Sequence, residues 1–479
     1  MPMNILMIMA DQLAGPALPA CGHPTVRTPH LDALAARGTV FENCYCNNPL
    51  CTPSRQSMIT GRLASAIGSY DNAAELPASV PTFVHHLRRG GYRTILAGKM
   101  HFIGPDQLHG FEERLNTDIY PATFEWTPDW RRGLYGNPGT SARKLLQSGP
   151  ADWTDQLTYD EDSQRRVLQR LGNLARRKND RPFFLCVSYT HPHDPYLISP
   201  KYWDLYRDVR IDLPAAPAEP FELMHPYCQW LHIHHEIDKY PPSAERIRAT
   251  RRAYYGMVSY VDDKVGELLA ALDRLGLWED TMVLFTSDHG DMMGEHGMWF
   301  KRTFHEWSAR VPLIVYKPGA RRGHRVPQVV SLVDVFPTLL DWAGLPPAEH
   351  PLDGRSFAAG LHGDLAGWKD CAIIEYMGEG LLAPMRCIRA GRYKYVHVHG
   401  YPPLLFDLQT DPLETHNLAA RPELAETGAR LRTAALKDFD PAAVHAAVLR
   451  SQQERLLIWE ALSQGEPHPW AWPENNVTK

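Results

Sequence analysis

Short apolar runs alternate with helix-like segments along this chain, and this alternation constrains its fold more than any other feature. Four runs have the continuity of strands buried on both faces, at 4–10, 92–97, 182–189 and 282–286. Segments with helical spacing of apolar residues lie at 29–37, 81–89, 160–177 and 245–275. Strands that alternate with helices favour a large, doubly wound, mostly parallel α/β sheet flanked by helices.

Further elements are expected around this pattern. Strands are predicted at 40–46 and 311–316, and a helix is predicted at 331–343. Two segments rich in proline and aromatic residues, 105–160 and 196–243, are predicted to be irregular. Loops of that length are usually functional or disordered, and the aromatic residues of the first one favour a functional loop.

The C-terminal part of the sequence has a different texture. Short strands are predicted at 371–376, 385–390 and 393–398, and a closing helix follows around 422–436. The pattern predicts a catalytic domain at 1–365 and a smaller α+β domain, carrying a short antiparallel sheet and a tail, at 366–479.

Polar side chains follow four of the predicted strands. They are Asp11 and Gln12, Lys99 and His101, His191 and His193, and Asp288 and His289. A single Asp or His after a strand is more often a cap or a turn residue. Because ligand sites lie beyond the carboxyl ends of parallel strands, four such clusters together predict a shared site at that edge of the sheet.

A fifth cluster is the stretch Cys-Thr-Pro-Ser-Arg at 51–55. Pro53 suits the first turn of a helix, where its missing N–H has no cost, and Gly61 suits the helix end. A helix N-terminus carries a partial positive charge and Arg55 adds a full one, so the position of Cys51 suits an anionic group. The alternative is a buried free thiol beside a capped helix.

The residue types in these clusters suit two tasks. Asp11, Gln12, Asp288 and His289 offer three oxygen ligands and one nitrogen, a set that suits Ca²⁺, Mg²⁺ or Mn²⁺. A hydrogen-bonded Asp–His pair without a metal is the alternative. Five cationic side chains would surround a tetrahedral anion, and a His or Lys among them could protonate a leaving alkoxide: Arg55, Lys99, His101, His193 and Lys301.

The same residues resemble the motifs of the type I sulfatases, a family of the alkaline phosphatase superfamily. The matching motifs are Asp11, 51–55 with Thr60-Gly61-Arg62, Gly98-Lys99-x-His101, His193-x-Pro195, Asp288-His289-Gly290, Lys301 and the segment LFDLQTDPLETHNLA. In that family the cysteine is oxidised to Cα-formylglycine, whose hydrate is the nucleophile. The resemblance therefore implies a formylglycine made from Cys51, one divalent cation, and a formylglycine-generating or equivalent maturation enzyme as a partner.

The resemblance also implies the metal ligands. The modified Cys51 would bind the metal together with Asp11, Gln12, Asp288 and His289. Many arylsulfatases have an Asp and an Asn where this chain has Gln12 and His289. This variant is similar to that of choline sulfatases and phosphonate monoester hydrolases, and its imidazole ligand favours Mn²⁺ somewhat.

The remaining family roles concern the sulfate group. Arg55 and Lys99 would hold the formylglycine diol, and Lys99, His193 and Lys301 would bind the sulfate. His193 or Lys301 would protonate the leaving oxygen. His101 would help to eliminate sulfate and regenerate the aldehyde.

Within the family, several segments closely resemble the choline sulfatases. They are 70–76, 98–115, 117–130, 189–196 and 375–385. A quaternary ammonium group has no N–H, so it needs aromatic faces and carboxylates rather than hydrogen-bond partners. The resemblance points to Asn72, Trp126, Glu375 and Glu379 as substrate-binding residues, with a buried core aromatic as the alternative for Trp126.

Three functions remain open at this stage. The leading expectation is hydrolysis of a small sulfate ester, choline sulfate first, to the alcohol and sulfate. A phosphonate monoester or phosphodiester hydrolase of the same superfamily is the second. A non-catalytic anion binder is the third, if Cys51 stays unmodified.

Composition excludes other classes of function. The net charge of −5 argues against nucleic-acid binding, which usually needs a basic chain. No apolar run of about 18 residues occurs, so no membrane partner is expected. The first residues lack a basic signal-peptide region, and eight cysteines in 479 residues do not form a disulfide framework, so a cytoplasmic location is expected. A homo-oligomer, dimer or tetramer, is also expected.

Overall fold

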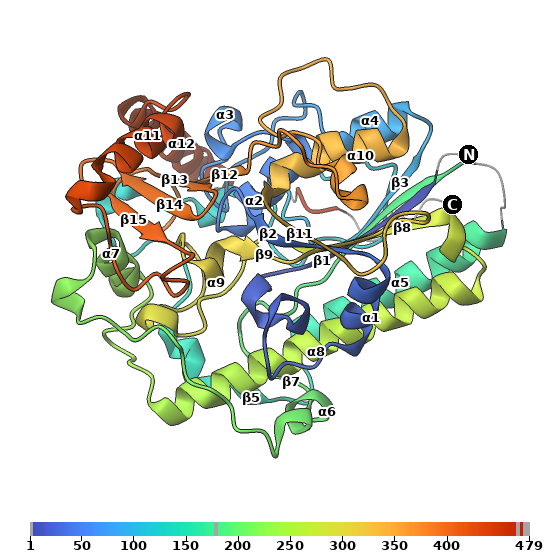
Figure 1. Ribbon diagram of the computed structural model, residues 1–479, viewed down its shortest axis with the longest axis horizontal. Coiled ribbons are helices and arrows are strands. Elements are labelled where there is room, and N and C mark those ends of the chain that lie inside the picture. Colours follow the sequence, from blue (N-terminus) through green and yellow to red (C-terminus); the bar gives the residue numbers. More distant parts are fainter. Residues whose placement is uncertain (1–2, 177–180, 466–469, 473–479) are drawn as a thin grey trace.

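The computed structural model describes residues 3–176, 181–465 and 470–472. Its main feature is a sheet that passes through the middle of the molecule with helices on both faces (Figure 1). Within the described residues this sheet has nine strands in the order β11-β2-β10-β8-β1-β6-β3-β4, with β9 paired to β2. The predicted fold class, a mostly parallel doubly wound sheet with a second, smaller sheet, is confirmed.

Four neighbouring strands form the centre of the large sheet. β1 (Asn4–Ala10) lies between β6 (Phe183–Ser188) and β8 (Thr281–Ser287), and β3 (Arg93–Gly98) pairs with the other edge of β6. All three pairings are parallel. These strands are nearly continuous apolar runs because helices cover both of their faces.

Two sets of helices form the outer layers, and each has its own apolar core. Figure 1 shows α1 (Pro29–Arg37), α5 (Asp155–Arg176) and α8 (Ala244–Arg274) on one face of the sheet. On the other face lie α4 (Phe83–Arg89) and α10 (Val335–Ala343), and α2 (Cys51–Thr60) packs with them. Residue 177, the last of the helix predicted at 160–177, lies outside the described residues.

Several elements differ from the sequence prediction. β10 (Leu313–Tyr316) runs antiparallel between β8 and β2 (Thr39–Tyr45), and β11 (His324–Ser331) pairs with β2. The sequence prediction missed β11 because Arg325, Pro327 and Gln328 interrupt its apolar pattern. It also missed α7 (Pro226–His234), which lies in a segment predicted to be irregular.

The second sheet is antiparallel throughout. It contains β12 (Cys371–Tyr376), β13 (Met385–Ala390) and β14 (Tyr393–Val398), which confirm the three predicted strands, and β15 (Leu404–Asp407), which was not predicted. α11 (Ala425–Ala435) packs on β13 and β14. The division into domains at residue 365 stays a prediction.

A second C-terminal helix, α12 (Pro441–Leu462), was not predicted. Its buried residues are only Val448, Gln452 and Arg455, so the sequence has no apolar stripe that would reveal it. It packs against the short turn Phe124–Trp126. No described helix is long and apolar enough to cross a membrane.

The remaining elements are short. The residues predicted as irregular, 105–160 and 196–243, consist largely of such short pieces and turns. The short helices and strands are α3 (Ala64–Ile67), α6 (Pro200–Trp203), α9 (Glu306–Ala309), β4 (Glu113–Arg114), β5 (Gly149–Pro150), β7 (Leu197–Ile198) and β9 (Arg310–Val311).

Candidate active site

Strand register brings the polar clusters together at one edge of the sheet. Ala10 pairs with Ser287, so the next residues, Asp11 and Asp288, lie side by side. Gly98 pairs with Ser188, which places Lys99 beside the same edge. Gly98 has φ +86°, and a Cβ there would lie 2.0 Å from the carbonyl oxygen of Ser188, so only glycine allows this approach.

Asp11, Cys51, Asp288 and His289 form a buried group of potential metal ligands. One ligand atom from each lies within 4.8 Å of the others. Nε2 of His289 is 3.8 Å from Oδ1 of Asp11, 3.7 Å from Oδ2 of Asp288 and 3.2 Å from Sγ of Cys51. Nδ1 of His289 donates to the carbonyl oxygen of Gly290 at 2.9 Å, which leaves the Nε2 lone pair directed at the group. This donor set fits a divalent cation.

Gln12 lies beside this group and is already hydrogen-bonded on both sides. Its Oε1 accepts from Nζ of Lys301 at 2.6 Å, and its Nε2 donates to Oδ2 of Asp291 at 2.5 Å. The structure therefore places Oε1 of Gln12 against Lys301, whose Nζ lies 3.3 Å from Sγ of Cys51, and anchors Nε2 of Gln12 on Asp291.

Arg55 ties the metal-ligand group to the sheet. Its Nε donates to Oδ2 of Asp288 at 2.8 Å, and its Nη1 donates to the carbonyl oxygen of Lys99 and to Oγ of Ser188. The Arg55 side chain is fully buried, and its Nη2 is 3.5 Å from Oδ2 of Asp11. In this structure it positions the carboxylates and the strand ends rather than facing the cavity.

Three cationic or basic side chains surround Cys51. Lys99 contacts Oδ2 of Asp11, Nζ of Lys301 lies 3.3 Å from Sγ of Cys51, and Nζ of Lys301 lies 2.7 Å from Nε2 of His193. Burial alone would raise the pKa of the Cys51 thiol, but Lys301, Lys99 and His289 outweigh it and hold the pKa well below its ordinary value. The site is therefore built to stabilise negative charge at position 51.

His101 and His193 differ in their hydrogen bonding. Nδ1 of His193 donates to the carbonyl oxygen of Asp194 at 2.6 Å, so its Nε2 accepts from Lys301. Neither ring nitrogen of His101 has a hydrogen-bond partner among the described residues. Burial lowers the pKa of the His101 imidazole, which keeps the ring neutral and able to accept a proton.

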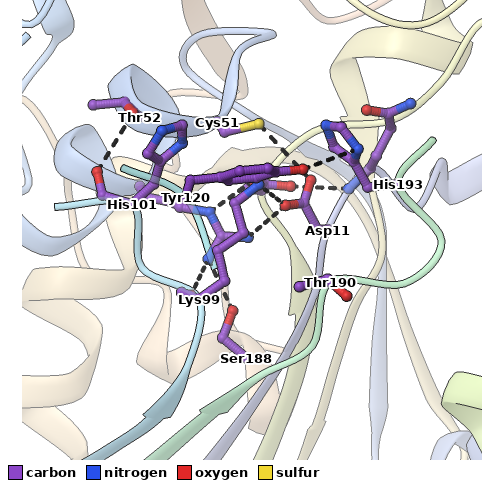
Figure 2. A network of polar contacts seen from close by, with 12 residues as sticks. Asp11, Cys51, Thr52, Lys99, His101, Tyr120, Ser188, Thr190 and His193 are labelled. Carbon is purple, nitrogen blue, oxygen red and sulfur yellow. Dashed lines mark hydrogen bonds and ion pairs between the residues drawn. The ribbon is translucent and has the colours of Figure 1, made fainter. Parts of the chain in front are cut away.

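Tyr120 connects these residues and was missed by the sequence analysis. Figure 2 shows its ring between Lys99, His101 and His193, with the hydroxyl directed at the His193 ring. The ring centre is 4.3 Å from Nζ of Lys99, and the hydroxyl oxygen is 3.3 Å from Nδ1 of His193. Tyr120 lies within the 117–130 segment that resembles choline sulfatases, so the segment was recognised although the residue was not.

A cavity of about 620 Å³ opens beside Cys51. Asn72, Trp126 and Glu379, three of the predicted substrate-binding residues, line it. Trp126 is partly exposed there, with its ring centre 5.2 Å from that of Tyr120, so it is not a core aromatic. Oδ1 of Asn72 also accepts from the backbone N–H of Thr52 at 3.0 Å, which satisfies one donor at the start of α2.

Glu375 does not line this cavity. Its carboxylate is fully buried, accepts from the backbone N–H and the hydroxyl of Ser65 at 2.8 and 2.7 Å, and lies 3.2 Å from Nε of Arg386. Glu375 lies within β12, whereas Glu379 lies in the connection after the strand, so the two nearby carboxylates belong to different surroundings. The structure assigns Glu375 to packing between segments.

The cavity wall includes residues that the sequence analysis did not select. They are the loop 136–140, Lys144 and Arg302. Nζ of Lys144 donates to Oδ2 of Asp194 at 2.8 Å. Arg302 follows Lys301 directly, and its guanidinium lies beside Glu379, with Nε 4.0 Å from Oε2. Arg302 could have been selected from the sequence because it is a second positively charged residue directly after Lys301.

Comparison with known proteins gives consistent matches over most of the chain. The family model described as "Sulfatase" matches residues 3–345, and the model described as "N-sulphoglucosamine sulphohydrolase, C-terminal" matches 294–439. A choline-sulfatase from Rhizobium meliloti (strain 1021) is 44% identical over 482 residues, covering 98% of this chain and 93% of the relative.

Solved structures show the same architecture. The phosphonate monoester hydrolase of Agrobacterium radiobacter matches with a TM-score of 0.72 and 28% identity, covering 92% of this chain and 96% of the other. The phosphonate monoester hydrolase of Silicibacter pomeroyi matches with a TM-score of 0.74 and 26% identity, covering 91% and 94%.

Proposed function

As a member of the sulfatase family this chain is a sulfuric ester hydrolase, and we propose that it hydrolyses small sulfate esters of quaternary-ammonium alcohols, choline sulfate first. The observation that carries this proposal is that Trp126 and Glu379 line the same cavity as Cys51. We call Cys51, Lys99, His193 and Lys301 the sulfate end of the site. We call Asn72, Trp126, Arg302 and Glu379 the leaving-group end.

We further propose that Cys51 is converted to formylglycine, whose hydrate supplies the nucleophilic oxygen. A divalent cation, Ca²⁺, Mn²⁺ or Mg²⁺, would be held by Asp11, Asp288, His289 and residue 51, with Gln12 beside them, and would stabilise negative charge on oxygen. The low pKa of the Cys51 thiol supports this, since the same positive charges would favour an oxyanion at that position.

Protonation of the leaving oxygen is assigned to the Lys301–His193 pair. Choline is a poor alkoxide leaving group, so the reaction needs a general acid. Lys301 carries the proton that it donates to Nε2 of His193 at 2.7 Å, and both side chains line the cavity. Lys99, held against Asp11, supplies positive charge at the sulfate oxygens. His101, with a neutral ring and unpartnered nitrogens, would accept a proton in the release of sulfate.

Recognition of the trimethylammonium group is assigned to Trp126 and Glu379. An indole face attracts a cation by roughly 0.5–2 kcal/mol, and it does so without hydrogen bonds. Glu379 is the only carboxylate among the described residues that line the cavity. The two side chains therefore offer the attraction that a quaternary ammonium can use.

A second candidate is hydrolysis of a phosphonate monoester or a phosphodiester. The likeness to two phosphonate monoester hydrolases supports it. The Gln12 and His289 pair supports it as well, since the sequence resemblance links that pair to both enzyme types. The third possibility, an anion binder, depends on an unmodified Cys51, which mass spectrometry of the Cys51 peptide would reveal.

The test is a comparison of kcat/KM for choline sulfate, an aryl sulfate and a phenylphosphonate monoester, with protein whose Cys51 peptide has been checked for conversion. We expect choline sulfate to be hydrolysed best. A preference for the phosphonate would overturn the proposal in favour of the second candidate. We also propose, for separate tests, a cytoplasmic location, a dimer or tetramer, and a maturation enzyme as a partner.

A further inference from the structure

Arg302 occupies an unusual position at the leaving-group end. It lies in the connection between β8 and α9, the residue is 2% exposed, and it lines the cavity. Its φ of 80° lies in the left-handed region, which is uncommon for any residue except glycine. The backbone N–H donates to the carbonyl oxygen of Pro49 at 3.1 Å, which fixes this conformation. The fold thus holds the Arg302 guanidinium against the cavity.

The hydrogen-bonding capacity of this guanidinium is largely unused. Neither Nε nor Nη1 of Arg302 has a hydrogen-bond partner among the described residues. The neighbouring carboxylate, Glu379, is 4.0 Å away through Oε2, and Oε2 also lacks a partner there. By contrast, the buried Arg455 donates from Nη1 and Nη2 to both oxygens of Asp71 at 2.6 Å. Tyr376 is a side-chain hydrogen-bond partner of Arg302, but Nε and Nη1 still lack an acceptor among the described residues. Because unpaired buried donors are costly, these two N–H groups call for an acceptor from a ligand.

The charges around the leaving-group end are unbalanced for a purely cationic substrate. Glu379 is the single carboxylate in the described cavity lining, whereas Lys144 and Arg302 are both cations. Lys144 is paired with Asp194, but no carboxylate of the described residues lies within hydrogen-bond distance of Arg302, since Glu379 is 4.0 Å away. A leaving group with only a positive charge would gain from Glu379 and lose against Arg302.

The size of the cavity also favours a leaving group that carries more than an ammonium group. Its volume of about 620 Å³ lies within the range of roughly 300–1,000 Å³ that holds drug-sized ligands. A small alkyl sulfate leaves much of that space to other groups. A carboxylate on the same alcohol would reach Arg302 while the ammonium group stays at Trp126 and Glu379.

We propose that Arg302 is a specificity-determining residue that binds a carboxylate on the leaving group. The preferred substrate is then the sulfate ester of a zwitterionic hydroxy acid, an alcohol that carries both a quaternary ammonium and a carboxylate. Arginine suits this task because its planar guanidinium donates two parallel hydrogen bonds to a carboxylate. This inference rests on the proposed sulfate-ester hydrolysis and narrows its substrate class.

The test uses four sulfate esters and two variants of the full-length enzyme. The esters are choline sulfate, its analogue with an added carboxylate, the carboxylated ester without the ammonium, and an uncharged aryl sulfate. Wild-type enzyme should prefer the zwitterionic ester over choline sulfate by about tenfold or more, the size of one charged hydrogen bond. Arg302→Met should remove that preference, and Arg302→Lys should keep part of it.

A second measurement avoids turnover altogether. Calorimetric binding of the zwitterionic product alcohol should weaken about tenfold in Arg302→Met, whereas binding of choline should stay the same or tighten. Thermal unfolding of both variants controls for loss of fold. The inference is overturned if Arg302→Met lowers kcat/KM equally for all four esters, or if wild type prefers choline sulfate. Absence of turnover for every ester, including the aryl sulfate, would instead count against the proposed function.

Discussion

The sulfate end and the leaving-group end of the cavity are built from different kinds of structure. Asp11, Lys99 and Asp288 follow the ends of β1, β3 and β8, where parallel register fixes their spacing. Trp126 belongs to a short helical turn, and Glu379 belongs to the connection after β12. The positions of the first group are therefore determined by the sheet, and the positions of the second group are determined by packing between segments that are distant in the sequence.

Hydrogen bonding differs in the same way. Around the sulfate end, Arg55, Lys301 and His193 each bind neighbours within 3 Å. At the leaving-group end, Nε of Arg302 and Oε2 of Glu379 have no partner among the described residues. The preorganised sulfate end suits a reaction step that is the same for every sulfate ester. The unused donors and acceptors of the leaving-group end suit selection between substrates. The predictions below test this division.

The largest expected effect comes from residue 51. Cys51→Ala and Cys51→Ser should lower kcat for sulfate esters by about 10⁴-fold or more, because the nucleophile is lost. Thermal unfolding should change little, since both side chains fit the buried position. Serine is the sharper variant, because the family's cytoplasmic machinery usually modifies cysteine. Turnover close to wild type in the alanine variant would refute the formylglycine mechanism.

Metal binding should depend on the two carboxylates of the metal-ligand group, Asp11 and Asp288. Asp11→Ala/Asp288→Ala should reduce metal content from about one ion per chain to a small fraction of that, because each carboxylate supplies charge as well as a lone pair. Elemental analysis after dialysis measures the content. Asp334→Asn, a change in a buried carboxylate that bonds Ser331 and Lys369 and none of the proposed ligands, is the control. Stoichiometric metal in the double variant would contradict the assignment.

The free energy of unfolding should depend on a contact between the wall of the leaving-group end and the last described helix. Arg455 of α12 and Asp71 form a buried ion pair with 2.6 Å contacts, and Asp71 precedes Asn72 in the cavity wall. Arg455→Met should destabilise the protein by about 3–5 kcal/mol, because Asp71 stays buried without its partner. Denaturant unfolding gives the value. The double variant Asp71→Asn/Arg455→Met should recover part of it, and no recovery would mean that the loss is due to packing alone.

A smaller effect is expected at Trp126. Trp126→Ala should raise KM for choline sulfate by about 2- to 30-fold, which corresponds to roughly 0.5–2 kcal/mol of cation–π attraction. The KM for an uncharged aryl sulfate should change much less, and Trp126→Phe should be intermediate. The ratio of the two kcat/KM values is the measurement. An equal loss for both esters would reduce Trp126 to a packing role.

The smallest effect concerns pH. Burial raises the pKa of Glu379 to about 7, with Arg302 opposing the rise and Asp71 adding to it. Below that pH the carboxyl is protonated and neutral, and above it the carboxylate attracts a cation. The KM for choline sulfate, relative to that for an aryl sulfate, should therefore fall about three- to fivefold as the pH rises through 7. Glu379→Gln should make the ratio independent of pH, and an unchanged slope would exclude Glu379.

The same division decides what the sequence could predict. Asp11, Lys99, His193 and Asp288 were found because strand-end residues of a parallel sheet converge wherever the strands are correctly identified. This rule uses only local pattern, and it needs no knowledge of the loops. The fold class and the antiparallel second sheet were also predicted from local patterns, namely the alternation of strands with helices and the short strands after residue 365.

No comparable rule predicts which loop residues reach the leaving-group end. Tyr120 and Arg302 depend on how loops cross the strand ends, and Glu375 was selected although only Glu379 reaches the cavity. The ion pair between Arg455 and Asp71 joins residues 384 positions apart in the sequence, and α12 has no apolar periodicity from which the helix could be predicted. Long-range packing of this kind leaves no local trace in one sequence.

Burial of Cys51 has a consequence for the order of events during synthesis. All ten residues of α2 are buried, and Cys51 itself is 1% exposed at the wall of the cavity, so an enzyme that alters its sulfur reaches it more easily before the chain closes around it. The contact between Asp71 and Arg455 waits for 384 further residues, which take roughly 20–80 s to synthesise at about 5–20 residues per second. If Cys51 is converted to formylglycine as proposed, the time of synthesis gives the maturation enzyme access to its sulfur before the Asp71–Arg455 contact forms.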